Sequence, residues 1–213
     1  MVRTYIESLG GYKFIQKLFG NTKRSAYRYT ENILDKYNNL IEYKYLHNAT
    51  RRLNQIKSDQ PITLANNLNL GSTINQVRNQ FKVKPFVKAY SSKGVRRTIL
   101  LYKIKLDGQK IKVEAHFYKN QLFFSKYIIS DVTESDRNNF LSLFSEKYSL
   151  QNLEFENKNI VDSNNNCAKI ENGLELSISY MQLNNLFFEK MQEKTAINTQ
   201  TIPLTYGVNL GVQ

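Results

Sequence analysis

The sequence has little cysteine, little histidine and no long apolar run, and each absence excludes a class of protein. Cys167 is the only cysteine among 213 residues, which excludes a disulfide framework or cysteine-based zinc site and favours a reducing compartment. No run approaches the roughly 18 apolar residues of a transmembrane helix. The N-terminus carries scattered charges instead of a continuous apolar stretch, so we expect no secretory signal peptide and a soluble protein made in the cytoplasm.

The sequence motifs of common enzyme classes are absent too. The two histidines, His47 and His116, lie in different expected elements, and no catalytic triad spacing, phosphate-binding loop or dinucleotide-binding glycine run occurs. Glu114 alternates with His116 and could form an acid–base pair, but we interpret both as a solvated polar strand face. The acidic residues near 131–136 fit helix N-terminal electrostatics better than metal binding. We expect no enzyme activity, cofactor or metal ion.

Acidic residues are scarce in the middle of the chain. The net charge is +12, and residues 61–120 carry 12 Lys and Arg against 2 Asp and Glu. Residues 1–60 carry 11 against 5, whereas residues 121–213 carry 7 against 11. This asymmetry predicts that one end of the protein meets an acidic partner, either nucleic acid, a membrane surface or a protein.

Periodicity predicts an α+β fold. Residues 1–60 follow helical spacing, with one long amphipathic helix from about Glu31 that ends before Pro61. Residues 71–130 predict a helix capped by Ser72 or Thr73 and then three antiparallel strands, with turns at 107–108 and near 120–121. A helix capped by Thr133 and further short strands follow.

The two helix-plus-strand segments resemble a diverged repeat. The stretch "NQLFFSK" at 120–126 parallels "NNLFFEK" at 184–190, and both segments predict the order helix, loop and three strands. We therefore expect a helical N-terminal extension at 1–60, a first α/β module at 61–131, a second at 132–192, and a C-terminal arm or strand at 193–213.

The first module also resembles a known family of small modules. In "LGSTINQVRNQF" and "ILLYKIKLDGQKIKVEAHFYKNQLFFSKY" the matching residues are Gly71, Thr73, Val77, Phe81, Tyr102, Phe117 and Leu122. This pattern resembles the α/β modules of the β-lactamase inhibitor protein type and of the small lipoprotein of the bacterial outer-membrane assembly machine. The lipid-bearing cysteine is missing, and Lys82-Val83-Lys84-Pro85 replaces the usual Gly-x-Pro. The resemblance implies a non-catalytic protein-binding module.

The densest basic sector lies at residues 82–112. A tight turn at Asp107-Gly108 would place Lys105 opposite Lys110 and Lys103 opposite Lys112, and like charges that face each other destabilise a sheet. Three explanations stay open, namely an edge hairpin protected against aggregation, a surface for a protein partner, and a nucleic-acid platform. The candidate binding residues are Lys82, Lys84, Lys88, Arg96, Arg97, Lys103, Lys105, Lys110 and Lys112.

The end of the sequence has the alternation of a β-strand. It places Leu204, Tyr206, Val208, Leu210 and Val212 on one face, after a polar and uncharged linker. This segment is either the last strand of the protein's own sheet or an arm that adds a strand to a neighbouring subunit.

These observations predict a non-enzymatic structural subunit that binds other proteins, including copies of itself, in a larger assembly. The composition is rich in Asn, Lys, Ile and Tyr, as is typical of AT-biased genomes. Our specific hypothesis is therefore a component of a phage or virus particle. The alternative is a nucleic-acid-binding protein that uses the basic 82–112 sector.

Overall fold

The computed structural model describes residues 23–52, 55–64, 68–92, 94–106, 109–150 and 158–197. The helices are α2 Lys23–Lys36, α3 Ile41–Arg52, α4 Ile74–Phe81, α5 Glu134–Lys147 and α6 Leu186–Ile197. The strands are β1 Gln55–Lys57, β2 Phe86–Ser92, β3 Val95–Leu106, β4 Gln109–Tyr118, β5 Gln121–Ser130, β6 Asn159–Val161, β7 Asn166–Asn172 and β8 Leu176–Gln182. The predicted arm with Leu204, Tyr206, Val208, Leu210 and Val212 lies outside the described residues.

All these strands form one mixed sheet in the order β1-β6-β7-β8-β5-β4-β3-β2. The two segments that each follow a helix meet where β5 pairs with β8 in antiparallel orientation. The pairing of β1 with β6 is the parallel one, and it places a strand from the N-terminal region at one edge. The other edge is β2, which pairs with β3. The prediction of a fold with both helices and strands is confirmed, and strands from 61–131 and from 132–192 belong to a single sheet.

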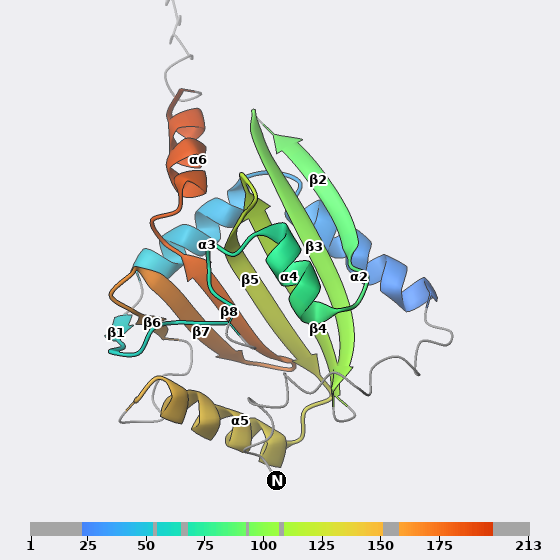
Figure 1. Cartoon of the computed structure of the whole chain (residues 1–213), viewed down its shortest axis with the longest axis vertical. Helices are drawn as coiled ribbons and strands as arrows, with labels where there is room; N and C mark the ends of the chain where they lie inside the picture. The colour runs from blue at the N-terminus through green and yellow to red at the C-terminus, as the bar shows by residue number, and fades with distance from the viewer. Residues whose placement is uncertain are drawn as a thin grey trace, which may run out of the picture.

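Helices cover both faces of the sheet, so that two apolar layers form (Figure 1). On one face, Val77 and Phe81 of α4 and Leu141 and Phe144 of α5 pack on buried strand residues such as Val113. On the other face lie α2 and α3, together with the start of α6, over a second cluster of side chains. That cluster includes Tyr37, Tyr43, Phe123, Phe124, Met181 and Phe187. Strand residues that alternate in sequence therefore enter two different cores.

Several local signals act as the sequence predicts. Thr73 begins α4 as the N-cap, and Thr73 and Gln76 form a complete capping box. Thr133 caps α5 by accepting a hydrogen bond from the backbone N–H of Asp136. The expected hairpin register is confirmed, because Lys105 pairs with Lys110 and Lys103 with Lys112. The next turn falls at 119–120, one residue earlier than expected, with a positive φ at both residues.

Three predicted secondary-structure elements differ from the structure. The long helix expected from Glu31 is broken between α2 and α3, where the chain turns at 37–40. Residues 55–57 of the expected helical extension form β1, because they pair with β6. The similar stretches differ in structure, since 120–126 enters β5 whereas 184–190 enters α6. Helix α6 also crosses the boundary expected at 192/193.

Asp162 joins the chain before α4 to the turn between β6 and β7. Its Oδ2 accepts a hydrogen bond from the backbone N–H of Ile62 at 2.8 Å, and its Oδ1 accepts from the backbone N–H groups of Asn164 and Asn166 at 2.9 Å each. Asp162 and Ile62 are both buried. The carboxylate thus satisfies backbone donors that water reaches poorly.

We expect Asp162→Ala to lower the free energy of unfolding by roughly 2–4 kcal/mol, because it leaves buried N–H groups without acceptors. Urea unfolding of wild type and variant measures this difference. The control is Asp59→Ala, which removes the same charge at an exposed position and should cost less than about 0.5 kcal/mol. Equal effects of the two substitutions would contradict this role of Asp162.

Candidate functional site

Glu114 and His116 lie in the core beneath α2 and α3, so the expectation of a solvated polar strand face is wrong. Glu114 is 1% exposed and His116 is 0% exposed. Their partners are tyrosines of the covering helices. The hydroxyl of Tyr29 donates to Glu114 Oε1 at 3.1 Å, and the hydroxyl of Tyr43 lies 2.7 Å from His116 Nδ1. This buried polar cluster fixes the helix pair to β4.

The contacts also set the protonation state of His116. Complete burial lowers the pKa of its imidazole below the usual value, so the ring is neutral near pH 7. His116 Nε2 lies 3.6 Å from Glu114 Oε2, which favours the tautomer with a proton on Nε2. Nδ1 then accepts the hydrogen bond that the Tyr43 hydroxyl donates. Burial, followed by the charge of Glu114, raises the pKa of Tyr29, which stays a donor.

Arg97 was expected in the basic binding surface, and the structure places it in the core instead. Its side chain is buried and donates hydrogen bonds to the carbonyl of Tyr37 and, at 2.8 Å, to that of Asn38. The guanidinium also lies 5.4 Å from the ring centre of Tyr43 and 5.1 Å from that of Tyr90. Arg97 therefore holds the turn between α2 and α3 and is not available to an external partner.

One pair of facing lysines in the β3–β4 hairpin lies close to an aromatic ring. Lys103 Nζ lies 5.4 Å and Lys112 Nζ 4.9 Å from the ring centre of Tyr29, a distance at which cations are attracted to the ring face. Lys112 also forms an ion pair with Glu175 at 2.9 Å. Burial, with the charge of Lys112, lowers the pKa of Lys103. The facing lysines thus bind Tyr29 of α2.

The next lysine pair is more exposed. Lys110 forms an ion pair with Asp131 at 3.2 Å, and both side chains are more than two-thirds exposed, where such pairs contribute little stability. Lys105 is exposed as well. The hairpin lysines therefore divide into an inner pair engaged in folding and an outer pair at the surface.

A separate basic surface lies around α4 and the β2 edge. Lys82 and Lys84 follow α4, Lys88 lies in β2 and Arg96 begins β3, and all four are exposed. No Asp or Glu occurs between Gln60 and Leu106 in the sequence. The segment that carries these residues supplies no carboxylate of its own and is therefore strongly positive.

Within the described residues, strand β2 is an open edge of the sheet. It has 7 residues and pairs with β3 along its full length, and it ends the strand order of the sheet. Phe86 is 47% and Val87 43% exposed, and Lys88 and Ala89 are exposed too. The backbone groups on its outer side can therefore pair with another strand.

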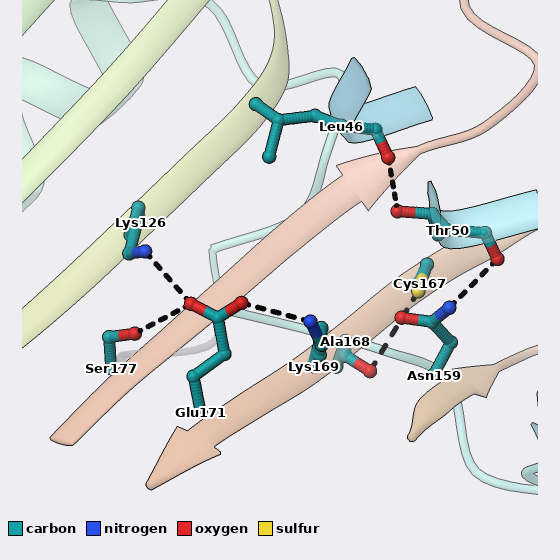
Figure 2. A network of polar contacts seen from close by, with 9 residues as sticks. All are labelled: Leu46, Thr50, Lys126, Asn159, Cys167, Ala168, Lys169, Glu171 and Ser177. Atoms are coloured by element: carbon teal, nitrogen blue, oxygen red, sulfur yellow. Dashed lines mark hydrogen bonds and ion pairs between the residues drawn. The ribbon is translucent and has the colours of Figure 1, made fainter. Parts of the chain in front are cut away.

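A polar network occupies the sheet face beside α2 and α3. Glu171 lies between Lys126 and Lys169 in Figure 2 and accepts hydrogen bonds from them at 3.0 and 2.9 Å and from Ser177 at 3.2 Å. Burial alone would raise the pKa of Glu171, but the hydrogen bonds and charges of Lys169 and Lys126 outweigh it and lower the pKa to about 2. Three strands, β5, β7 and β8, contribute to this network.

Sequence reasoning did not find the residues of this network or the tyrosines of α2 and α3. Lys126, Lys169 and Glu171 occupy positions that face the same side of the sheet once β5, β8 and β7 are paired. The strand order that brings them together is not visible in local sequence patterns. Cys167, near the network, is buried, and burial raises the pKa of its thiol to about 12, as expected for an unreactive cysteine.

The chain matches no protein-family model, no curated protein and no solved structure. The resemblance of residues 68–130 to the β-lactamase inhibitor protein type stays a prediction. None of the helices within the described residues has the length and apolar character that crossing a membrane requires. Within the same ranges, no three His, Cys, Asp or Glu side chains come close enough together to hold a metal ion.

Burial predicts a pH dependence of stability. It lowers the pKa of His116 and of His47, so below about pH 6.5 the unfolded chain takes up protons that the folded chain does not. The free energy of unfolding should fall as the pH drops from 7.5 to 5.5, by up to about 1.4 kcal/mol per pH unit for each histidine. Urea unfolding of wild type, His116→Gln and His47→Gln measures the contributions.

Each substitution should reduce the pH dependence of the free energy of unfolding by the contribution of the histidine that it removes. The pKa of Glu171 is about 2 in the folded protein, below the ordinary value of about 4.3 for a glutamate. Its contribution to the free energy of unfolding is therefore complete above about pH 4.3 and is lost only at lower pH. It does not affect this window. A wild-type free energy that is constant between pH 7.5 and 5.5 would contradict a neutral, buried His116.

Proposed function

We propose that the protein is a non-enzymatic structural subunit that binds other proteins in a larger assembly, and that β2 is its docking strand. The open edge of β2 carries this proposal, because its exposed Phe86 and Val87 lie beside backbone groups that can pair with an added strand. Natural edge strands are usually short, bent or covered. A phage or virus particle is the specific assembly that the sequence predicts.

The occupant that fits β2 is the C-terminal arm of a neighbouring copy. Residues 198–213 contain no charged residue, and their alternation places Leu204, Tyr206 and Val208 on one face. An uncharged extended segment can lie along β2 without adding to its positive charge or leaving a carboxylate buried. The alternating stretch is at least as long as the 7 residues of β2. Addition of this arm would link copies of the chain head to tail.

The internal organisation supports a repeated unit as part of this proposal. The order β6-β7-β8 on one side of the β5–β8 junction mirrors β3-β4-β5 on the other side. A helix precedes each group, α4 the first and α5 the second. We propose that the two units at 61–131 and 132–192 derive from one helix-plus-sheet module.

A double substitution tests the docking strand. Phe86→Lys with Val87→Lys should weaken self-association by roughly tenfold or more, because an added strand would have to bury two ammonium groups. The free energy of unfolding of the isolated chain should change by less than about 0.5 kcal/mol at such exposed positions. Light scattering coupled to size exclusion, over a range of protein concentrations, measures the association.

The control and a truncation separate the alternatives. Ile41→Lys with Leu186→Lys replaces apolar residues that are equally exposed, at 55% and 50%, and should leave association unchanged. A chain that ends at residue 197 should lose association as the β2 variant does. If the truncated chain assembles fully and melts at a lower temperature, the arm is a strand of its own sheet and the docking proposal fails.

Nucleic-acid binding is the second candidate, favoured by the basic corner around α4 and β2. Lys82, Lys84, Lys88 and Arg96 are exposed there, and the span from Gln60 to Leu106 holds no carboxylate. The hairpin residues Lys103 and Lys112 contribute less to such a surface, because they are held against Tyr29. The binding surface of this candidate therefore centres on α4 and β2.

Charge reversal distinguishes this candidate from docking of an uncharged arm. If the corner binds phosphates, changing Lys82, Lys84, Lys88 and Arg96 to Glu should abolish binding to single-stranded DNA and RNA and flatten its salt dependence. The same change at Lys110 and Lys190, two exposed lysines outside the corner, should have a small effect. Fluorescence anisotropy at several salt concentrations measures both. Unchanged affinity of the fourfold variant would eliminate nucleic-acid binding by this corner.

A further inference from the structure

A small cavity lies between the α2–α3 pair and the sheet, remote from the β2 edge. Its volume is about 50 Å³. The end of α2 contributes Lys36 and Tyr37 to its wall, and α3 contributes Leu46, Ala49 and Thr50. Its floor is a row of residues from four neighbouring strands, Asn159 in β6, Lys169 in β7, Ser179 in β8 and Lys126 in β5. Two of these wall residues, Lys36 and Ala49, are exposed to solvent.

The charges around this cavity favour an anion. Lys36, Lys126 and Lys169 line it against a single carboxylate, Glu171. Glu171 already accepts hydrogen bonds from Lys126, Lys169 and Ser177, so little of its acceptor capacity is left. Each lysine carries three N–H donors, and the bonds to Glu171 use only one from each of the two strand lysines (Figure 2). A cationic ligand would meet three ammonium groups.

One buried polar atom at the cavity has no hydrogen-bond partner among the described residues. It is Oδ1 of Asn159, a residue that lines the cavity and is fully buried. The amide of Asn159 is oriented by its Nδ2, which donates to the carbonyl of Thr50 at 2.8 Å. Asn159 therefore offers an acceptor, and a buried group of this kind normally binds a ligand or water.

Size limits what can bind. A group the size of a water molecule needs about 10–15 Å³ of cavity volume. A cavity of about 50 Å³ therefore has room for roughly four or five non-hydrogen atoms. That is the size of a single oxyanion and too small for a nucleotide or a drug-sized molecule. The unpaired acceptor on Asn159 further requires a donor on the ligand, which a protonated oxyanion supplies.

We propose that this cavity binds a small oxyanion that carries a hydroxyl group, with hydrogen phosphate as the best-fitting class. Lys126, Lys169 and Lys36 donate to its charged oxygens, and its P–OH donates to Asn159 Oδ1. Glu171 holds the ammonium groups of Lys126 and Lys169 in place. The bound anion connects the helix pair to strands of both sheet halves, β5 of the first and β6 to β8 of the second.

Titration with two matched anions tests the proposal. Backbone amide NMR signals of the full chain are followed at pH 7.5 and constant ionic strength while sodium phosphate or sodium sulfate is added. Phosphate should shift the signals of Lys126, Lys169 and Ser179, with saturation, and leave those of Lys105 and Lys110 unshifted. Sulfate has the same shape and charge but no hydroxyl, so it should bind several-fold more weakly because Asn159 Oδ1 stays unpaired.

Two variants locate the site. Lys169→Met should weaken phosphate binding by roughly tenfold, the effect of losing one charge-assisted hydrogen bond. Lys105→Met removes the same charge from an exposed position on the same sheet face and should leave the affinity unchanged. Shifts of equal size at Lys105 and Lys169 in the wild-type chain would mean general attraction to a basic protein and overturn the proposal. Equal affinities for phosphate and sulfate would overturn the assignment of a hydroxyl-bearing anion.

Discussion

Strand β4 is buried on both faces from Val113 to Phe117, and the polar side chains there must therefore find partners inside the protein. A carboxylate and an imidazole without such partners would each cost several kcal/mol. Glu114 and His116 obtain them from Tyr29 in α2 and Tyr43 in α3. The position of the helix pair, the burial of Arg97 and the cavity between helices and sheet all depend on this requirement.

The same requirement explains the lysines of the β3–β4 hairpin. Close to the tyrosines, Lys103 and Lys112 lie within cation–π distance of Tyr29, and the charge of Lys112 is partly balanced by its ion pair with Glu175. Farther along, Lys105 and Lys110 are exposed, where water screens their repulsion. Lys103 and Lys112 would repel each other in an isolated hairpin, but in the folded protein they form part of the contact between α2 and the sheet.

Local chemistry could be predicted from the sequence, and distant contacts could not. The caps of α4 and α5 and the β3–β4 register follow from residues close to one another, and they agree with the structure. The prediction that Glu114, His116 and Arg97 are exposed is wrong. It was based on their alternation with apolar residues, which suggested one solvated face. Helices from residues 23–52 cover that face, and nothing near 97–116 indicates them.

The candidate sites show the same limit. Exposed lysines such as Lys88 could be assigned from composition and charge alone. Lys126, Lys169 and Glu171 form a network only because β8 inserts between β5 and β7. The similar stretches at 120–126 and 184–190 were misleading for a related reason, since the same apolar letters suit a buried strand or a buried helix face.

The parallel pairing of β1 with β6 has a consequence for how the chain folds. It joins Gln55 to Asn159, so the intervening chain must be closed into a loop before this edge can form. That loop contains α4, α5 and four strands of the sheet. A topology with such non-local pairing has a high contact order and folds slowly. The β1 edge, and the docking of α3 just before it, should be among the last steps of folding, when most of the sheet already exists.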